Sequence, residues 1–429
     1  MANAVQDILL YPLRIHADAP VIEELYSSIQ QAIESVMTGE RFKKLKRGSR
    51  IGITAGSRGI ANYVPIMQSI VQVFKDKGYE PFLLSSMGTH GRGEPEGQRE
   101  ILDSLGITPE QMNCSVSYSS DVVVLGEMEA YGRTLPIYCA KDACEADAVL
   151  VVNRIKPHTS FHGDYESGLL KMITVGMGRV PGATMFHSLG AGLLREAIPL
   201  FGERLLELAP IVGGIGIVEN ANEQTAIIEG IPKENIFERE KKLLEEAKRL
   251  MPRLPMNQAD ICIVGEMGKN YSGTGMDTNI IGRLRIQGVA EPSAPQFTYI
   301  GVLRLSEPSH GNATGIGLAD FTTEDLVNGI DKKATYLNCM TSGFVIRAAI
   351  PMTFPTDLEL VAGAVQALHM EDVNSLRMVA IKNTLHIDHI WVTKAIYEEV
   401  KNLEHITLDG NPSAITFDSG GNWLWNAVK

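Results

Sequence analysis

The chain has 429 residues, with 39 basic and 51 acidic side chains and a formal net charge of −12. This length exceeds what one hydrophobic core usually supports, so two domains are expected. The acidic balance argues against a nucleic-acid partner, because a phosphate backbone attracts basic surfaces. Five cysteines without paired spacing indicate reduced thiols in a cytoplasmic protein, and no apolar run is long enough to span a bilayer.

Strands and helices are predicted to alternate along the first part of the sequence. A short strand is expected near Ile8–Leu13, and Asp18 and Pro20 predict the start of a helix that Gly39 ends. Strands are then predicted at 50–54, 79–85, 148–155 and 211–218, with a β-rich passage at 115–139. Helices are predicted up to residue 74 and around 101–105, 189–198 and 234–250.

The proline pair Pro252 and Pro255 is the candidate domain boundary, dividing the chain into residues 1–256 and 257–429. In the second part, strands are predicted at 260–264, 299–305 and 378–381, and helices at 323–330 and 358–368. Strands that alternate with helices predict an α/β fold with mainly parallel sheets in both domains.

Four glycine-rich segments each follow a predicted strand: 55–59, 88–97, 265–275 and the central stretch 149–187. Since the carboxyl ends of parallel strands meet at one edge of a sheet, residues distant in sequence can converge there: Arg58, His90, His158, Lys171 and Lys269. Each segment alone is equally compatible with an ordinary turn.

The central stretch carries the densest group of titratable side chains. His158 and His162 are four residues apart, but Pro157 and Gly163 flank them and make a helix unlikely, so a zinc site that adds Glu166 has weak support. The glycines of this stretch are too many for a plain core helix, and we interpret it as the active site.

Two further residues of this stretch have alternative interpretations. Lys171 is either a surface lysine lying along apolar neighbours or a partly buried nucleophile with a lowered pKa. His187 either caps the following helix or is a neutral imidazole ligand for a soft divalent metal. Upstream, Ala55–Gly59 can present backbone N–H groups and Arg58 to a phosphate or carboxylate, although it matches no nucleotide-binding loop.

The ordered set resembles the nickel-dependent lactate racemase family. The resemblance rests on Gly88-Thr89-His90, on Pro157-His158, on Lys171, and on His187 sixteen positions beyond that lysine. It spans most of the chain and is strongest from residue 50 to 190. It implies two α/β domains with the active site in the cleft between them, residues 1–256 tethering the cofactor and residues 257–429 closing the substrate cleft.

The resemblance also implies residue roles. Lys171 would tether a nickel-pincer nucleotide covalently, His187 would complete the nickel coordination, and Gly56, Ser57 and Arg58 would contact the cofactor. His90 and His158 would be the paired acid and base in the reversible oxidation of an α-hydroxy acid through a 2-oxo acid. An imidazole suits both roles because it titrates near neutral pH.

Two segments depart from the family pattern and bear on the substrate. Lactate racemases typically carry an Asp-x-Thr-Arg motif where this chain has Thr54–Arg58, and a Lys-Asp-x-Asn-x-Tyr-Gln pattern where it has Lys269–Gly275. With Lys269, Asn270 and Arg283 as candidate substrate-binding residues, we expect a hydroxy acid that is larger or more polar than lactate, such as a sugar acid.

Two other functions remain open on the sequence. One is a non-catalytic or cofactor-handling relative that binds nickel or the nucleotide without turnover, which the altered arginine motif favours. The other is a zinc hydrolase built on His158, His162 and Glu166. No membrane or nucleic-acid partner is expected, whereas a homo-oligomer, the substrate and the role of His162 are left undecided.

Overall fold

The computed structural model describes residue 5 and residues 7–425, and the chain forms two compact units. The first unit comprises residues 18–251, and the second unit comprises the segment up to Ala17 together with residues 252–429. Both units are α/β, and over the whole described chain more strand pairs are parallel than antiparallel, which confirms the predicted fold class. Within the described residues, no helix has the length and apolar character needed to cross a membrane.

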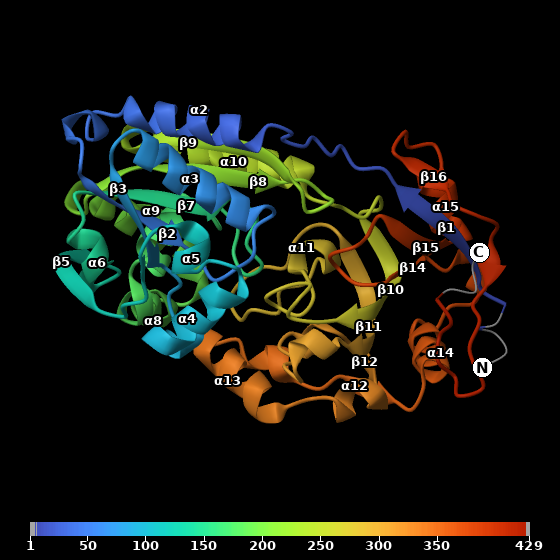
Figure 1. Ribbon diagram of the computed structural model, residues 1–429. Coiled ribbons are helices and arrows are strands. Elements are labelled where there is room, and N and C mark those ends of the chain that lie inside the picture. Colours follow the sequence, from blue (N-terminus) through green and yellow to red (C-terminus); the bar gives the residue numbers. More distant parts are fainter. Residues whose placement is uncertain (1–4, 6, 426–429) are drawn as a thin grey trace. The chain divides into compact units, whose positions relative to one another are not determined.

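The sheet of the first unit has parallel strands except at one edge, where β9 is antiparallel (Figure 1). In spatial order its strands are β4 (Val116–Ser117), β3 (Glu80–Ser85), β2 (Arg50–Ala55), β7 (Ala148–Arg154), β8 (Ile211–Glu219) and β9 (Thr225–Pro232). A separate antiparallel hairpin is formed by β5 (Val122–Ala130) and β6 (Arg133–Ala140).

Helices cover both faces of this sheet. Alternate residues of β7 point into two hydrophobic cores: Val149 and Val151 into one, Leu150 and Val152 into the other. This is why its sequence is continuously apolar rather than alternating. The first core contains α9 (Ala191–Leu208) and α10 (Ile236–Leu250), and the second contains α2 (Leu25–Met37) and α3 (Tyr63–Asp76). The remaining helices include α4 (Pro95–Ser104), α5 (Pro109–Met112) and α6 (Lys141–Cys144).

The first helix begins later than the sequence predicted. Asp18 and Pro20 lie outside α2, which starts at Leu25. The carbonyl of Pro20 accepts a hydrogen bond from Asn220 and the N–H of Ile22 donates to the carbonyl of Thr225. These long-range hydrogen bonds hold the backbone of residues 20–22 outside a helix, so the helix start predicted from the local sequence does not form there.

The second unit has a larger sheet, in which β1 lies far from its sequence neighbours. Its spatial order is β13 (Met352–Phe354), β12 (Phe321–Thr323), β11 (Gln296–Leu305), β10 (Gln258–Met267), β14 (Met378–Ile381), β15 (His389–Thr393), β1 (Leu9–Ile15) and β16 (Ile406–Leu408), and β17 (Ser413–Ala414) also pairs with β1. The helices are α11 (Thr278–Ile281), α12 (Glu324–Asn328), α13 (Lys332–Ser342), α14 (Asp357–Ala367) and α15 (Lys394–Val400).

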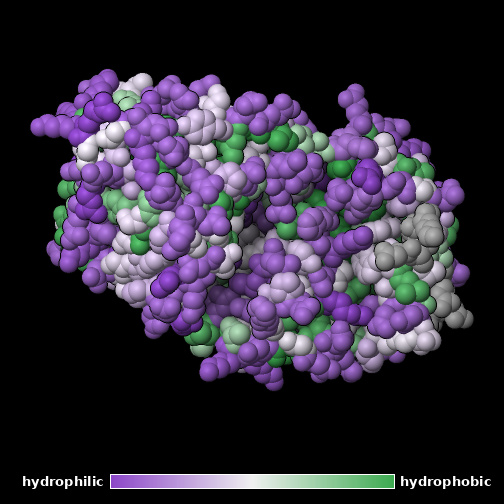
Figure 2. All heavy atoms as spheres, in the orientation of Figure 1, coloured by the Kyte–Doolittle hydropathy of each residue, from purple (hydrophilic) through white to green (hydrophobic). Residues whose placement is uncertain are grey.

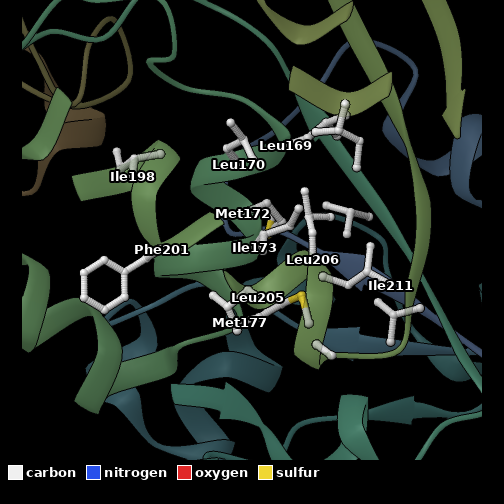
Figure 3. Close-up of a cluster of buried hydrophobic side chains, with 14 of the residues drawn as sticks. Leu169, Leu170, Met172, Ile173, Met177, Ile198, Phe201, Leu205, Leu206 and Ile211 are labelled. Carbon is white, nitrogen blue, oxygen red and sulfur yellow. The ribbon is translucent and has the colours of Figure 1, made fainter. Parts of the chain in front are cut away.

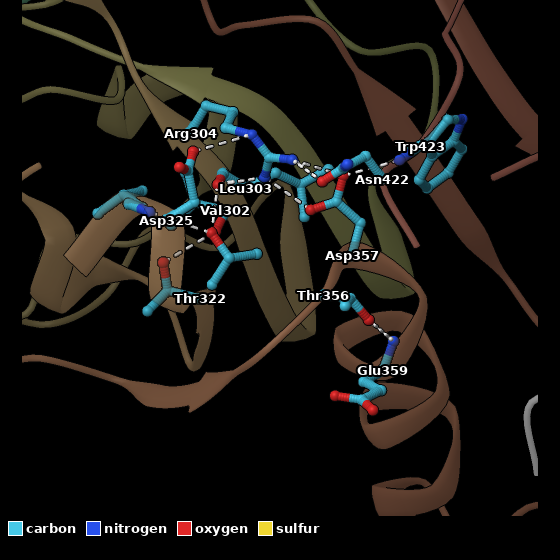
Figure 4. A network of polar contacts seen from close by, with 12 residues as sticks. Val302, Leu303, Arg304, Thr322, Asp325, Thr356, Asp357, Glu359, Asn422 and Trp423 are labelled. Carbon is cyan, nitrogen blue, oxygen red and sulfur yellow. Dashed lines mark hydrogen bonds and ion pairs between the residues drawn. The ribbon is translucent and has the colours of Figure 1, made fainter. Parts of the chain in front are cut away.

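The N-terminal strand therefore belongs to the second unit, whereas the sequence-based division at residue 256 placed it in the first. β1 runs antiparallel to both β15 and β16. An ion-pair network also ties the C-terminal segment to this unit: Arg304 of β11 donates to Asp357 at 2.7 Å, and Asp357 accepts the N–H of Trp423 at 2.8 Å (Figure 4).

Candidate functional site

The strand order of the first unit creates a topological switch point between β2 and β7. From β2 the chain continues to β3 on one side, and from β7 it continues to β8 on the other. Ligands of open α/β sheets bind at the carboxyl ends of such strand pairs. The loops that leave this edge are residues 56–60 after β2, 86–90 after β3, and 155–168 after β7. They carry half of the site residues predicted from the sequence: Gly56, Ser57, Arg58, His90 and His158.

A broken helix supports these loops. It consists of α7 (Leu169–Lys171), the π-helical segment η3 (Met172–Gly176) and α8 (Arg179–Ser188). The N–H of Gly88 donates to the carbonyl of Gly176, and a Cβ on Gly56 would lie 3.1 Å from the Met172 methyl group. Two of the glycine-rich loops therefore contact the π-helical segment, a type of structure that often occurs at functional sites.

The buried side of this helix fixes its position. Leu169, Leu170 and Ile173 pack in one cluster with Phe201, Leu205 and other apolar residues of α9 (Figure 3). Burial of such side chains contributes about 1.5–3 kcal/mol each relative to exposure. The neighbouring Lys171 is therefore carried on a rigid support.

Lys171 itself is half-buried, and its pKa is lowered to about 7. Burial is the main cause, the positive charges of Lys156 and Arg58 add to it, and the carboxylate of Glu166 opposes it. The Nζ atom also lies 6.0 Å from the centre of the Phe161 ring. With this pKa a large share of the amine is neutral near pH 7, and a neutral amine is nucleophilic. Of the two alternatives for Lys171, this environment favours the nucleophile.

His158 lies on the same aromatic ring. Its imidazole stacks on Phe161 with a centroid distance of 4.2 Å, so Phe161 contacts both predicted residues. The N–H of Ser160 donates to His158 Nδ1 at 3.0 Å. Because Nδ1 accepts this bond, the proton of the neutral ring resides on Nε2. In this tautomer His158 acts as a hydrogen-bond donor through Nε2.

Glu166 anchors the loop after β7. It is buried and accepts hydrogen bonds from the N–H of His158 at 2.6 Å and of Gly163 at 3.2 Å, and its other partners are Lys248 at 2.7 Å and His162 Nδ1 at 3.2 Å. Burial raises its pKa, but the bonds from His162, Lys248 and the His158 N–H outweigh this effect, so the pKa is lowered. Glu166 is thus an ionised structural anchor.

The same contacts bear on the zinc hypothesis. The carboxylate that would have to bind zinc is committed to backbone N–H groups and a lysine. Throughout the part of the chain that the structure describes, no three His, Cys, Asp or Glu side chains are grouped so that they could hold a metal ion. The arrangement of His158, His162 and Glu166 required by the zinc hydrolase hypothesis is therefore not formed.

His90, in the loop after β3, contacts the loop after β2. Its Nδ1 atom lies 2.5 Å from the hydroxyl of Ser57, which links the loop after β3 to that after β2. Arg58, next in sequence, is exposed and close enough to Lys171 to lower its pKa. His90, Ser57 and Arg58 thus lie at one edge of the sheet, as the parallel arrangement predicts.

His187 lies in the last turn of α8 and does not cap the next helix, whose N-cap residue is Gly190. The cap interpretation is therefore wrong. The residue is exposed at the surface, and its pKa is lowered first by partial loss of contact with water and second by the positive charge of Lys171. The imidazole is consequently neutral at pH 7, the form that binds metals.

Two residues that the sequence did not single out position this helix. Glu240 of α10 is buried and accepts the N–H of Leu170 at 2.9 Å, and burial raises its pKa to about 8. Arg179, with a φ of 51° at the start of α8, is fully buried and binds Asp142 at 2.7 Å. Glu240 lies in a helix of alternating charges, where nothing in the sequence distinguishes it from its exposed neighbours.

In the second unit, Lys269 and Asn270 follow the carboxyl end of β10. Lys269 Nζ donates to Asn338 of α13 at 2.7 Å, and its N–H donates to Ser309 at 2.8 Å. Asn270 accepts a hydrogen bond from Ser306 at 2.6 Å. These two predicted residues therefore lie in a cluster of hydroxyl and amide groups at the ends of β10 and β11.

Arg283 lies at the opposite end of the same strands, apart from Lys269. It donates to the carbonyl of Phe297, near the start of β11, and pairs with Asp320 at 2.5 Å. There it helps to line an open cavity of about 680 Å³ together with Gln258 and Gln296, the first residues of β10 and β11. The sequence grouped Arg283 with Lys269 by proximity in the chain, which the fold does not preserve.

The side chains of the first unit fit the group that the sequence resemblance implied. Arg58 and Lys156 supply positive charge suited to an anionic nucleotide, and Lys171 offers a reactive amine. A nickel centre whose other donors belong to the cofactor requires few ligands from the protein, and the neutral imidazole of His187 is a suitable one.

Comparisons with known proteins bear on the fold. No protein-family model matches the chain, and no curated protein matches it significantly. Its structure is similar to that of the lactate racemase apoprotein from Thermoanaerobacterium thermosaccharolyticum, with a TM-score of 0.52 and 12% identity over 87% of this chain and 94% of that one. It is also similar to a structural-genomics target from Thermotoga maritima, with a TM-score of 0.50 and 15% identity over 77% and 83% of the two chains. The chain therefore has a lactate-racemase-like fold.

Proposed function

We propose that this chain is a racemase or epimerase of an α-hydroxy acid that works with a nickel-pincer nucleotide. The observation that carries the proposal is a lysine with a pKa near 7 that shares the Phe161 ring with His158 and lies close enough to His187 to lower its pKa. His90 contacts Ser57 of the loop after β2 at the same sheet edge. The lactate-racemase-like fold is consistent with this function.

Each side chain has a role that suits its environment. Lys171 would attach the cofactor through its neutral amine, and the cationic neighbours that lower its pKa would bind the phosphate. The rest of this phosphate-binding site would be formed by Gly56, Ser57 and Arg58. His187 would bind the nickel. The cofactor would supply the hydride acceptor that no side chain provides.

The two remaining histidines would move the hydroxyl proton of the substrate. His158 carries its ring proton on Nε2, so in this state it can donate but not accept through that atom. His90 is oriented by Ser57 at Nδ1. We therefore propose that one histidine takes the hydroxyl proton of the stereoisomer it faces, and that the other, in its protonated form, returns a proton after hydride has come back to the opposite face. For the opposite stereoisomer the two roles would be exchanged.

The substrate proposal rests on the second unit. Lys269 and Asn270 are surrounded by Ser306, Ser309 and Asn338, a polar setting suited to a hydroxy acid that carries further hydroxyl groups. A substrate larger or more polar than lactate, such as a sugar acid, is consistent with it. Arg283 is bound to Asp320 at the other end of the strands, and we assign it a structural role.

The test compares wild type with His90→Ala and His158→Ala, each made in cells able to build the cofactor. Both variants should lose net inversion, since every turnover needs one residue to remove the proton and another to return it. With a panel of separate hydroxy acid stereoisomers, rapid quenching should still detect the 2-oxo acid from one isomer only, and the two variants should prefer opposite isomers.

Controls separate this proposal from its rivals. Lys171→Ala should show only the polypeptide mass, whereas wild type should carry an adduct. Lys171→Arg should fail as well, because a guanidinium is a poor nucleophile. If the protein carries nickel and a covalent adduct but isomerises no hydroxy acid, the hypothesis of a cofactor-handling relative would be favoured. Full activity in His90→Ala, or the same isomer preference in both variants, would exclude the two-base mechanism.

A further inference from the structure

A group of exposed apolar side chains covers part of the second unit. They come from α13, from the short helix η7 (Val345–Ala348) and from β13, and each is at least 45% exposed. We call this group the α13 face: Tyr336, Leu337, Met340, Val345, Ile346 and Met352. Figure 2 shows apolar atoms at the lower edge of the molecule, where Figure 1 places α13.

The helix exposes these residues because Thr335 and Cys339, four residues apart, form its buried side. Leu337 and Met340, three residues apart, share the outer side and are 61% and 63% exposed. The outer side has the composition of an interface and not of a solvated surface.

The six residues of the α13 face carry no charge, and the nearest charged side chains of the helix are the exposed Lys332 and Lys333 at its start. Between Ala334 and Thr356 the only charged residue is Arg347. Its guanidinium is 1% exposed and donates to the carbonyl of Leu284, so it does not reach the surface. In a chain with 21% charged residues and a net charge of −12, a stretch of this length without surface charge is a distinct region.

The size of the face matches that of a dimer interface. The exposed fractions of the six residues correspond to roughly 650 Å² of exposed surface, whereas a stable interface buries about 800 Å² on each partner. The largest apolar patch on a typical monomer covers about 300–600 Å². The polar rim around the face would supply the remaining area.

Strand addition does not explain this surface. β13 is an edge strand of three residues, but Pro351 and Pro355 flank it and cannot donate to a neighbouring strand. The contact must therefore be made by side chains of α13 and η7.

We propose that the α13 face is the interface of a two-fold homodimer. Two copies that approach through most other surfaces bring acidic side chains together, because each carries a net charge of −12. The uncharged α13 face lets them meet without that repulsion, and a two-fold axis pairs the same apolar patch with itself. The interface would also order Asn338 of α13, which binds Lys269.

The experiment measures the mass of the full-length protein in solution by light scattering over a range of concentrations. Wild type should show twice the chain mass of 46.8 kDa, and the dimer should strengthen as salt screens the net charge. Leu337→Glu with Met340→Glu should give the mass of a single chain, because the interface would bury four unpaired carboxylates. Val124→Glu, on the exposed β5 of the first unit, should remain dimeric.

Folding is checked in the same samples. The far-ultraviolet circular dichroism of all variants should match wild type, since Leu337 and Met340 point outward. If the double variant misfolds, Met340→Lys alone provides the second test, and it should weaken the dimer. Wild type that stays at 46.8 kDa at every concentration, or a double variant that is folded and still dimeric, would overturn the proposal.

Discussion

Lys171 shows how burial and neighbouring charge tune one side chain. Its pKa of about 7 results first from burial and second from the positive charges of Lys156 and Arg58. The same lysine on an open surface would have a pKa near 10.4 and would be almost entirely protonated at neutral pH. The reactivity on which the proposed function depends is therefore produced by the surroundings of Lys171.

This environment predicts a pH-dependent cost to stability. Between about pH 7 and about pH 10.4 the unfolded chain holds a proton that folded Lys171 has lost, so the free energy of unfolding rises with pH in this window. In protein made without cofactor, Lys171→Met should be more stable than wild type by about 1–3 kcal/mol at pH 6.5. The difference should shrink towards pH 10.

Denaturant unfolding at several pH values measures this effect. Lys241→Met is the control with the opposite sign, because a hydrogen bond and ion pair with Asp164 raise the pKa of the exposed Lys241. That variant should lose a little stability at neutral pH. A Lys171→Met variant whose advantage did not change with pH would show that Lys171 keeps an ordinary pKa.

At the scale of elements, α7, η3 and α8 form one broken helix that carries both Lys171 and His187. Gly168 at the start of α7 has an extended backbone, so its role is steric and not conformational. A Cβ at this position would lie 2.1 Å from a carboxyl oxygen of Glu240. That carboxyl group accepts the N–H of Leu170, so the close approach of α10 requires a glycine.

Gly168→Ala should therefore destabilise the protein by about 1–3 kcal/mol, because Glu240 must move and leave a buried N–H unpaired. It should also change the rate at which Lys171 reacts with an amine reagent. Gly192→Ala in α9 is the control: a Cβ there meets nothing within 4 Å, and the variant should be more stable by about 0.5–1 kcal/mol.

Thermal unfolding of these variants and of the double variant Gly168→Ala, Glu240→Ala measures the coupling. Removing the Glu240 carboxyl group relieves the contact, so the two changes should be clearly non-additive. Additive effects would mean that Gly168 and Glu240 act independently and that the α10 contact does not position α7.

At the scale of the whole molecule, each unit has its own hydrophobic cores. The buried residues of the two large cores that cover the first sheet all lie between Ile29 and Leu250. The core of the second unit includes Leu10 of β1 with Ile261 and Ile263 of β10. The chain thus contributes β1 to the second unit, then forms the first unit with residues 18–251, and then forms the rest of the second unit.

This organisation predicts that mutations near the N-terminus act on the distant half of the sequence. Leu10→Ala should destabilise the second unit by about 2–5 kcal/mol, because Leu10 is 2% exposed. Hydrogen exchange should rise in β14 and β15 and stay unchanged in β2 and β8. Ile33→Ala in α2 should give the reverse pattern. Increased exchange in β2 caused by Leu10→Ala would contradict this assignment of β1.

Local patterns in the sequence determined the elements and part of the site. The apolar run of β7 and the glycines after β2 and β3 identified parallel strands with loops at their carboxyl ends, and these signals depend on residues close in the chain. The prediction that His90, His158 and Lys171 meet at one sheet edge follows from the same rule.

Tertiary structure decided everything that depends on partners distant in sequence. The position of β1 beside β15, the start of α2, the separation of Arg283 from Lys269 and the pKa of Lys171 are all set by such partners. Glu240 is the clearest case: only the packing of α10 against α7 distinguishes it from the other acids of its helix. Burial and long-range pairing are properties of the folded chain, and no local pattern encodes them.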